Sequence, residues 1–408
     1  MLKVIVQSWP LLLGVMLLMV GNGVQGSLLG IRGASEGFST FQLSVVMSAY
    51  FLGFLGGSRL APEMIRRVGH VRVFSALGSM ISAVLILYPL LVDWTAWALM
   101  RVLIGFCFSG IYVTAESWLN NTASNETRGQ ALSAYMIVQM LGIIASQGLL
   151  AMGDPRGFGL FIIPSVLVSL AFMPILLADT PAPTFDTITR MSFAALFRAS
   201  PLGCAGMLLT GGIYSAMFGM ASVYGAMTAM TLGQIAAFVA AMYVGGLVLQ
   251  YPIGWMSDRM DRRALVLWLS AAGAAVMAVA TVFALPYTFE LVIALLLGGI
   301  INPLYSLLIA HTNDYLTKAE MPGASAGLIF LNGFGAIFGP LIIGWLMGVF
   351  GARGYFLFIG LLFAVLAGYA AWRMGRRQAP SNPGSYTGLT PTASSLAVGA
   401  VLEAEARR

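Results

Sequence analysis

Runs of apolar residues recur along almost the whole chain and are separated by short polar segments. A run of ~20 apolar residues matches the length of an α-helix that crosses the ~30 Å hydrocarbon core of a bilayer. Lipid cannot hydrogen-bond to an open backbone, so such runs must be helical. The pattern predicts twelve spans, at residues 9–31, 42–60, 72–92, 95–118, 129–151, 158–178, 201–223, 232–254, 264–285, 288–312, 323–348 and 354–373.

Composition supports this interpretation, because 59% of the residues are hydrophobic and only 9% are charged. A soluble domain has about 25% charged residues. We therefore predict an all-α integral membrane protein. Lys3 precedes the first apolar run, as in a signal peptide, but the many later spans favour an uncleaved helix.

Basic residues are distributed unevenly between the two sides of the predicted membrane. Seventeen of the 21 lie on the side that carries both termini, against three on the opposite side (Arg32, Arg156 and Arg353) and one, Arg101, inside a span. Cytoplasmic loops of membrane proteins are rich in Lys and Arg. The distribution predicts cytoplasmic termini and a multi-pass protein of the cell inner membrane. The net charge of +6 is then a topology signal and gives no indication of nucleic-acid binding.

The chain divides into two similar halves. Residues 179–200 contain "ADTPAPTFDTITR" and form a predicted cytoplasmic linker between six-helix bundles at residues 1–178 and 201–375. A shift of 194 residues places Glu126 of "NETRGQALSAY" on Glu320 and Gly129 on Gly323 of "KAEMPGASAGL", and each segment leads into the fifth helix of its half. This is the pattern of a duplicated six-helix unit. Residues 376–408 are rich in Pro, Ser, Thr and Gly, and a disordered cytoplasmic tail is predicted.

A loop motif relates the chain to a known family. "GWMSDRMDRR", at residues 254–263, resembles the loop motif of the major facilitator superfamily, with Asp261 in place of its second Gly. The corresponding loop of the first half has Arg66 at the position of the motif's Asp. The residues that match are Arg67, Gly69 and Arg72 in the first half and Gly254, Asp258, Arg259, Arg262 and Arg263 in the second.

Four further segments extend the resemblance. Arg101 and Gly105 match a second motif of the superfamily, and "GAIFGPLIIG" in the eleventh span resembles the Gly-Pro motif of drug antiporters. "AESWLNNTASNETRGQALSAYM" and "NPLYSLLIAHTNDYL" resemble the YcaD-like branch of bacterial transporters. The resemblance implies two rocking six-helix bundles and a gate held by Asp258 and Arg259.

Ionisable residues inside a membrane are expensive and indicate function. Arg101 lies on one helical stripe with Gly105, Phe108 and Tyr112, and Glu116 lies about 60° from it. For Arg101 the alternatives are snorkelling to headgroups and, as the resemblance implies, proton coupling or substrate binding. Glu116 is either a gate residue, paired with Arg128 or an arginine of the loop at residues 61–71, or a proton carrier.

His311 near Asp314 is either a structural or gating residue or a proton site. Other polar side chains recur at helical spacing on spans expected to line a cavity. They could bind substrate or could instead join helices and satisfy local backbone groups. These candidates are Asn22, Gln25, Tyr112, Tyr135, Gln139, Asn302 and Tyr305.

Several function classes are excluded or disfavoured by the sequence. The two lysines, Lys3 and Lys318, follow no nucleotide-binding glycine pattern, and no metal-ligand or nucleophile–base cluster is recognisable. We predict a monomeric secondary transporter, not an enzyme, that uses a small-molecule substrate and protons and needs no cofactor or metal. Uptake of a polar solute, efflux of amphipathic compounds and a non-transporting membrane sensor remain the alternatives.

Overall fold

The computed structural model describes residues 2–122, 127–177, 191–317, 320–376, 386 and 388–389. Within these residues the secondary structure is helical, and twelve helical segments are long and apolar enough to cross a membrane. The predicted all-α fold with twelve spans is confirmed. The third span is shorter than predicted, because its helix ends at Leu87 instead of residue 92. Asp93 then begins the next helix by accepting hydrogen bonds from the backbone of Thr95 and Ala96, both at 2.9 Å.

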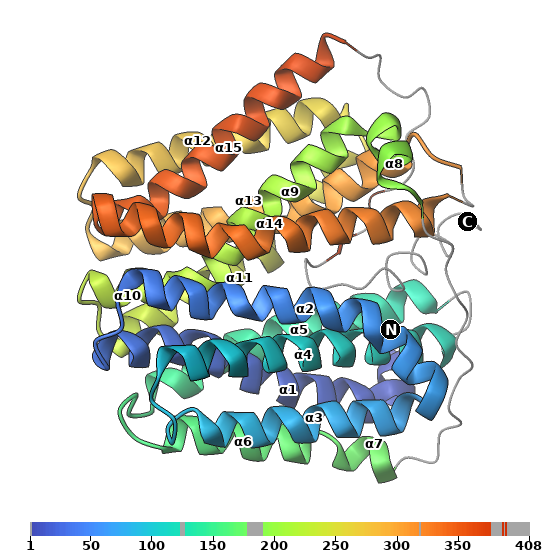
Figure 1. Ribbon diagram of the computed structural model, residues 1–408. Coiled ribbons are helices and arrows are strands. Elements are labelled where there is room, and N and C mark those ends of the chain that lie inside the picture. The colour runs from blue at the N-terminus through green and yellow to red at the C-terminus, as the bar shows by residue number, and fades with distance from the viewer. Residues whose placement is uncertain are drawn as a thin grey trace.

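The helices of each half lie side by side (Figure 1). The N-terminal half contains α1 (Leu2–Ser35), α2 (Thr40–Val68), α3 (His70–Leu87), α4 (Trp94–Thr122), α5 (Arg128–Ala151), α6 (Gly159–Leu170) and α7 (Met173–Leu177). The C-terminal half contains α9 (Pro201–Ser215), η1 (Ala216–Met220), α10 (Ala221–Met227), α11 (Leu232–Ser257), α12 (Arg262–Val282), α13 (Tyr287–Asn313), α14 (Met321–Phe350) and α15 (Arg353–Met374). A short helix, α8 (Phe193–Ala199), lies in the predicted linker.

The second helix of each half begins with the same device. Ser39 accepts a hydrogen bond from the backbone of Gln42, and the Gln42 side chain accepts one from the backbone of Ser39. Thr231 and Gln234 form the matching pair at the start of α11. This capping box satisfies amide groups that the first turn of a helix leaves without partners. The duplication therefore extends to the way in which corresponding helices start.

Within each half, two helices touch backbone to backbone at glycines. A Cβ atom on Gly105 of α4 would lie 1.9 Å from the carbonyl oxygen of Tyr50 in α2. A Cβ atom on Gly298 of α13 would lie 1.7 Å from the carbonyl oxygen of Met242 in α11. Only glycine permits these approaches, and small residues are what allow membrane helices to pack closely.

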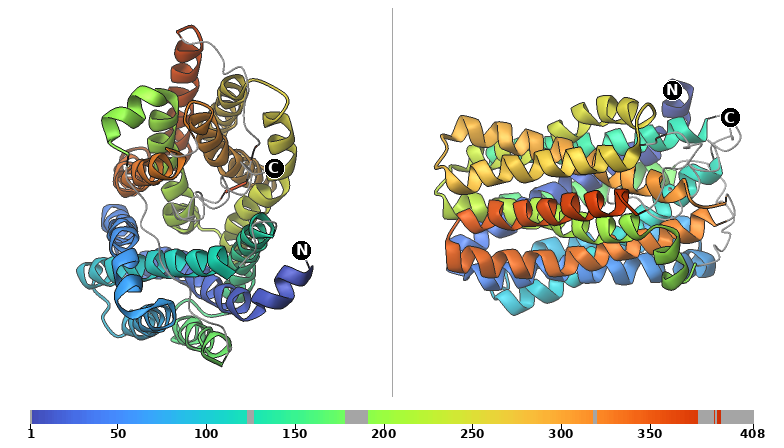
Figure 2. Two further views of the ribbon diagram at one scale, coloured as in Figure 1. Left: turned by 90° about the vertical axis from the view of Figure 1, so that its right-hand side faces the viewer. Right: turned by 90° about the horizontal axis from the view of Figure 1, so that it is seen from above.

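The two halves pack against each other along α2 and α14, where Ser48 donates to the carbonyl oxygen of Ile337 and Arg59 lies over the ring of Phe330 at 5.0 Å. We call the end that carries the start of α1 and the end of α15 the termini side, and the opposite end the far side (Figure 2). On the far side, Thr40 of α2 contacts Met227 of α10 at 3.8 Å, and Gly344 of α14 packs on Ser44 of α2. In addition, α5 packs against α11. The two halves are therefore closed against each other on the far side.

Substituting alanine for Gly298 should separate α11 from α13. Overpacking typically costs about 1–3 kcal/mol, so Gly298→Ala should lower the melting temperature of the detergent-solubilised protein. Gly348→Ala is the matched control, because no atom lies within 4 Å of the position its Cβ would occupy. Equal melting temperatures for the two variants would contradict the glycine contact.

Candidate functional site

Arg101 is fully buried in the N-terminal half. Its Nη1 donates a hydrogen bond to Oε1 of Gln25 in α1 at 2.9 Å, and its guanidinium lies 4.8 Å from the ring centroid of Tyr50 in α2. Nη2 contacts the sulfur of Met47 at 3.3 Å, and Nε has no hydrogen-bond partner. The guanidinium points into the protein, so snorkelling to headgroups is excluded.

The charge of Arg101 is not balanced by a carboxylate. None of the ion pairs between described residues includes Arg101. A guanidinium stays protonated at any physiological pH, and a buried charge without a counter-ion is expensive. An amide oxygen, an aromatic face and a thioether stabilise it only in part. The arrangement is therefore suited to an anionic group that arrives from outside the chain.

Two amides of α1 extend this polar network. Asn22 donates to the hydroxyl of Tyr112 in α4 at 3.1 Å, and Gln25 donates to the hydroxyl of Tyr88 at 3.3 Å. Oδ1 of Asn22 is buried and has no partner among the described residues. Asn22, Gln25, Arg101 and Tyr112, which the sequence singles out on two separate helices, thus come together.

Six buried tyrosines gather at the centre of the molecule, three from each half. This tyrosine cluster comprises Tyr50, Tyr112, Tyr135, Tyr214, Tyr243 and Tyr305. Tyr112 interacts electrostatically with Tyr50, Tyr135, Tyr214 and Tyr243, and Tyr305 interacts with Tyr214. The hydroxyl of Tyr135 interacts with Glu116 and Gln139, and that of Tyr243 interacts with Tyr214. The hydroxyl of Tyr305 is buried without a hydrogen-bond partner among the described residues. Buried hydroxyls normally have partners, so the Tyr305 hydroxyl suits a polar ligand.

Glu116 lies between the two halves. It is fully buried, and its carboxylate interacts electrostatically with Tyr135 of α5 and with Tyr305 of α13. Gln139 of α5 also faces Tyr135. The side chain of Arg128, one partner predicted for Glu116, lies outside the described part of the structure. The position of Glu116 beside two tyrosine hydroxyls keeps both the gate and the proton-carrier interpretations open.

Asn302 plays a local role in this conformation. It donates to the carbonyl oxygen of Gly298 one turn earlier at 3.0 Å and packs against Gly246 of α11. Asn302 thus satisfies a backbone carbonyl group near Pro303, which is one of the two roles predicted for it. Tyr305, in contrast, faces the other half through Glu116.

A small cavity adjoins the tyrosine cluster. It measures about 30 Å³ and is lined by Tyr50, Phe54, Tyr214, Phe218 and Asn332, among others. A single water needs about 10–15 Å³ of such space, so this cavity is too small for a solute. The ring of Tyr214 stacks on Phe218 in η1, and Phe218 also contacts Tyr50 across the two halves. A π-helical turn of this kind often marks a functional position.

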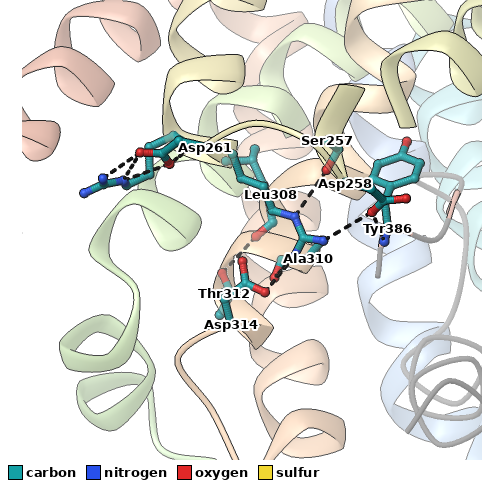
Figure 3. A network of polar contacts seen from close by, with 10 residues as sticks. Ser257, Asp258, Asp261, Leu308, Ala310, Thr312, Asp314 and Tyr386 are labelled. Carbon is teal, nitrogen blue, oxygen red and sulfur yellow. Dashed lines mark hydrogen bonds and ion pairs between the residues drawn. The ribbon is translucent and has the colours of Figure 1, made fainter. Parts of the chain in front are cut away.

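The loop between α11 and α12 is organised by Arg262. Its Nη1 contacts Oδ1 of Asp314 at 2.6 Å, with both side chains only 3% exposed, and its Nη2 lies 3.7 Å from Asp258. Arg262 also donates to Ser257 at 3.2 Å and to the carbonyl oxygen of Ala310 at 3.3 Å (Figure 3). These bonds fix the loop to the last turn of α13.

The neighbouring motif residues make local contacts. Arg259 lies over the ring of Trp255 at 4.2 Å, so the structure places Arg262 rather than Arg259 beside Asp258. Gly254 belongs to the last turns of α11. Arg263 binds Asp261 at 2.6 Å, and its hydrogen bonds hold the pKa of Asp261 below its ordinary value. The gate that the family resemblance assigns to Asp258 and Arg259 stays a prediction.

The loop of the first half lacks such a network among its described residues. Arg66 and Arg67 are exposed and both pair with Glu63, at 2.8 Å and 2.6 Å. Gly69 has a positive φ of 85°, which favours glycine at this turn, and Arg72 is exposed. Arg66 replaces the Asp of the motif, and the two arginines form ion pairs with Glu63 inside α2.

His311 lies away from the tyrosine cluster, on the termini side of the C-terminal half. It lines a small recess together with Ser200, Arg263, Tyr315 and Arg373, and its ring lies edge-on to Tyr315 at 5.2 Å. These neighbours belong to the C-terminal half and the chain just before it. This position favours a structural role over proton transfer.

The sequence reasoning missed half of the tyrosine cluster, namely Tyr50, Tyr214 and Tyr243. The internal repeat does contain a signal for Tyr50 and Tyr243, because both are tyrosines at equivalent positions of the two halves. Tyr50 and Tyr243 are 193 residues apart, as are Tyr112 and Tyr305. His70, whose Nε2 lies 2.9 Å from the hydroxyl of Ser117, was also missed. The offset of 193 residues places His70 opposite Arg263, so the repeat supplies no matching histidine.

Twelve spans in two packed halves, with buried polar groups between them, define a polytopic membrane transporter. The sequence profile of the Major Facilitator Superfamily matches residues 11–232 and 202–402, and the chain belongs to this family. Two solved structures share the fold. The nucleoside transporter NupG matches with a TM-score of 0.73 at 13% identity, covering 91% of this chain and 99% of that one. A D-xylose-proton symporter matches with a TM-score of 0.69 at 14% identity, covering 92% and 98%.

Curated relatives point to one branch of the family. An uncharacterized MFS-type transporter of Yersinia enterocolitica, YE1530, is 25% identical over 363 residues, covering 88% of this chain and 92% of its own length. YcaD of Escherichia coli O45:K1 is 25% identical over 352 residues, covering 86% and 91%. The predicted resemblance to YcaD-like transporters is confirmed.

Breaking the Arg262–Asp314 pair should destabilise the protein. Removing one member of a buried ion pair costs about 3–5 kcal/mol, so Asp314→Asn should lower the melting temperature markedly. Asp261→Asn, which removes the more exposed partner of Arg263, should have a smaller effect. A double variant, Arg262→Met with Asp314→Leu, should recover part of the loss. Equal, small effects of the two single variants would contradict the anchoring role of Arg262.

Proposed function

We propose that this protein is a secondary transporter of the bacterial inner membrane that moves a small, polar, anionic solute by alternating access. The observation that supports the substrate class best is Arg101, a fully buried cation with no ion-pair partner among the described residues. A carboxylate or a similar anion of the solute would supply the missing counter-charge. The amides of Asn22 and Gln25 and the tyrosine cluster would bind the polar remainder.

The rocking of two rigid halves is the proposed mechanism. Closure on the far side through Thr40, Met227, Ser44 and Gly344 corresponds to one end state. The termini side is taken as cytoplasmic because most Lys and Arg residues lie there, so the closed far side is the outer side of the membrane.

Proton coupling is assigned to Glu116 rather than to Arg101. Arg101 cannot release its proton, whereas a buried carboxyl between tyrosine hydroxyls can exchange one. Glu116 interacts with Tyr305 of the opposite half, so its environment changes when the halves separate. His311 lies apart from this region and is proposed to be structural.

Efflux of an amphipathic compound is the second candidate. The aromatic lining of the small cavity, with Phe51, Phe54 and Phe218, favours a partly apolar substrate. A cationic amphipathic compound would be repelled by Arg101, so anionic or neutral compounds are the ones expected under this alternative. A sensor that binds but does not translocate would show ligand binding without counterflow in proteoliposomes.

The orientation can be tested with reporter fusions. Fusions after residues 190 and 378 should report the cytoplasm, and a fusion after residue 288 should report the outside, because Lys and Arg concentrate on the termini side. A periplasmic signal after residue 378 would overturn the orientation and, with it, the assignment of the far side to the outside of the membrane.

Arg101 provides the test of the substrate class. Arg101→Met should raise the melting temperature of the ligand-free protein, since it removes a buried charge that has no counter-ion. In a thermal-shift screen of small carboxylates, phosphates and matched uncharged analogues, wild-type protein should be stabilised by anionic compounds, and Arg101→Met should not respond.

Arg101→Lys separates charge from geometry, because it keeps the cation but loses the planar fork. It should retain part of the ligand response and part of the counterflow. If Arg101→Met responds to the same ligands as wild type, Arg101 does not bind substrate.

A further inference from the structure

Toward the termini side, α11 and α13 hold another part of the chain between them, and we call this binding surface, at Gln250, Gly254 and Ser306, the groove. Near their middle the two helices touch directly, because a Cβ atom on Gly245 would lie 1.9 Å from the carbonyl oxygen of Leu295. Toward the termini side the contact passes to side chains, first Gly246 against Asn302 and then the amide of Gln250, which donates to Ser306 at 3.2 Å. Beyond this point another part of the chain fills the space between the helices.

That part is the C-terminal segment at Tyr386, Gly388 and Leu389. The backbone N–H of Leu389 donates to the hydroxyl of Ser306 at 2.8 Å, and this hydroxyl donates to the carbonyl oxygen of Leu389 at 2.9 Å. The phenol of Tyr386 accepts from Gln250 at 3.0 Å, and the backbone N–H of Tyr386 donates to Oδ1 of Asp258 at 2.7 Å. Four directed hydrogen bonds therefore hold two residues of the segment.

Burial adds to these hydrogen bonds. The side chain of Leu389 is only 3% exposed and joins the hydrophobic core. The ring of Tyr386 lies on Gly254, where a Cβ atom would approach it to 2.7 Å. Gly388 packs against Gln250. A glycine at 254 thus provides the flat surface on which the aromatic ring rests. Most of the tail that we predicted to be disordered lies outside the described residues, but these three residues are in contact with the C-terminal half.

The segment lies next to the elements that would move during transport. Ser306 follows Tyr305 of the tyrosine cluster and lies one turn beyond Asn302, on the termini side of both. Asp258, which the Tyr386 backbone engages, is the acidic residue of the loop motif and faces Arg262 (Figure 3). Tyr386 and Leu389 therefore contact both α11 and α13, and the Tyr386 backbone binds the carboxylate of the loop.

We propose that the groove between α11 and α13 is a binding site for a peptide, and that the chain's own residues Tyr386, Gly388 and Leu389 occupy it as an autoinhibitory plug. The bound segment keeps the two halves closed on the far side, and its release permits the opposite state. The inhibitory effect rests on the proposed transport function, whereas the binding of the segment does not.

Peptide binding to the full chain tests the site. The probe is a fluorescent peptide with the sequence of residues 383–391, PGSYTGLTP, followed by anisotropy. It should bind the full chain that carries Leu389→Asp, because a carboxylate cannot replace the buried leucine and the groove is left empty. It should not bind wild type or the control Leu402→Asp, in which the tail still occupies the groove.

Two further variants refine the binding test. Ser306→Ala, added to Leu389→Asp, should weaken peptide binding about fivefold through the lost hydrogen bonds. Tyr386→Ala offers a second way of emptying the groove if Leu389→Asp expresses poorly. Absence of peptide binding to both emptied chains, or equal binding to wild type, would overturn the site.

Alkylation of a far-side cysteine tests the inhibitory effect. Ser44→Cys, in a chain with Cys107 and Cys204 replaced by alanine, is buried against Gly344 in the present state. Its alkylation rate should rise severalfold when Leu389→Asp is added and should not change with Leu402→Asp. Peptide binding combined with unchanged alkylation would leave the site in place and overturn the plug. Failure of the anion screen, in contrast, would affect only the proposed substrate.

Discussion

The direct backbone contacts between α2 and α4 and between α11 and α13 are the constraint on which the rest of the structure depends. In lipid no hydrophobic force draws apolar helices together, so close packing and small residues must hold them. Gly105 and Gly298 provide these contacts at positions where any side chain would collide with a carbonyl oxygen. The two helix pairs thereby form rigid units. The buried polar groups can keep fixed positions on them while the halves move.

The duplication of the six-helix unit explains why the two halves pack in the same way. The positions at which the two halves differ are those that bear the functional side chains. Gly105 and Gly298 are 193 residues apart, as are Tyr112 and Tyr305. The same offset places Arg101 opposite Ala294, which is buried and apolar. A shared scaffold therefore bears a charge in one half only. Because an alanine meets the packing needs of this position, packing does not require the arginine, and its cost in stability must be offset by function.

The sequence predicted most of the fold because membrane spans follow directly from hydropathy, and each span forms its backbone hydrogen bonds internally. It also placed Arg101 and Tyr112 on one stripe, since both belong to a single helix. Contacts between helices were harder to predict. Nothing in the order of residues showed that Arg262, rather than Arg259, would face Asp258, because α13 supplies the surrounding groups. Leu389 lies in a segment whose composition indicates disorder, and only the groove gives it partners.

The position of α4 connects the proposed binding and gating events. Arg101 lies toward the far side of this helix and Glu116 toward the termini side, and contact with α2 at Gly105 keeps the helix rigid. A solute anion that neutralises Arg101 acts where the halves are closed, among residues of α1 and α2. Glu116 meets the opposite half through Tyr305, whose next residue, Ser306, holds the C-terminal segment. Separation of the halves therefore changes the surroundings of both charges through one rigid helix. Separation of the halves also changes the surroundings of α13, which binds the C-terminal segment. Substrate, proton and C-terminal segment would therefore act on one equilibrium, that between the two end states of the transporter.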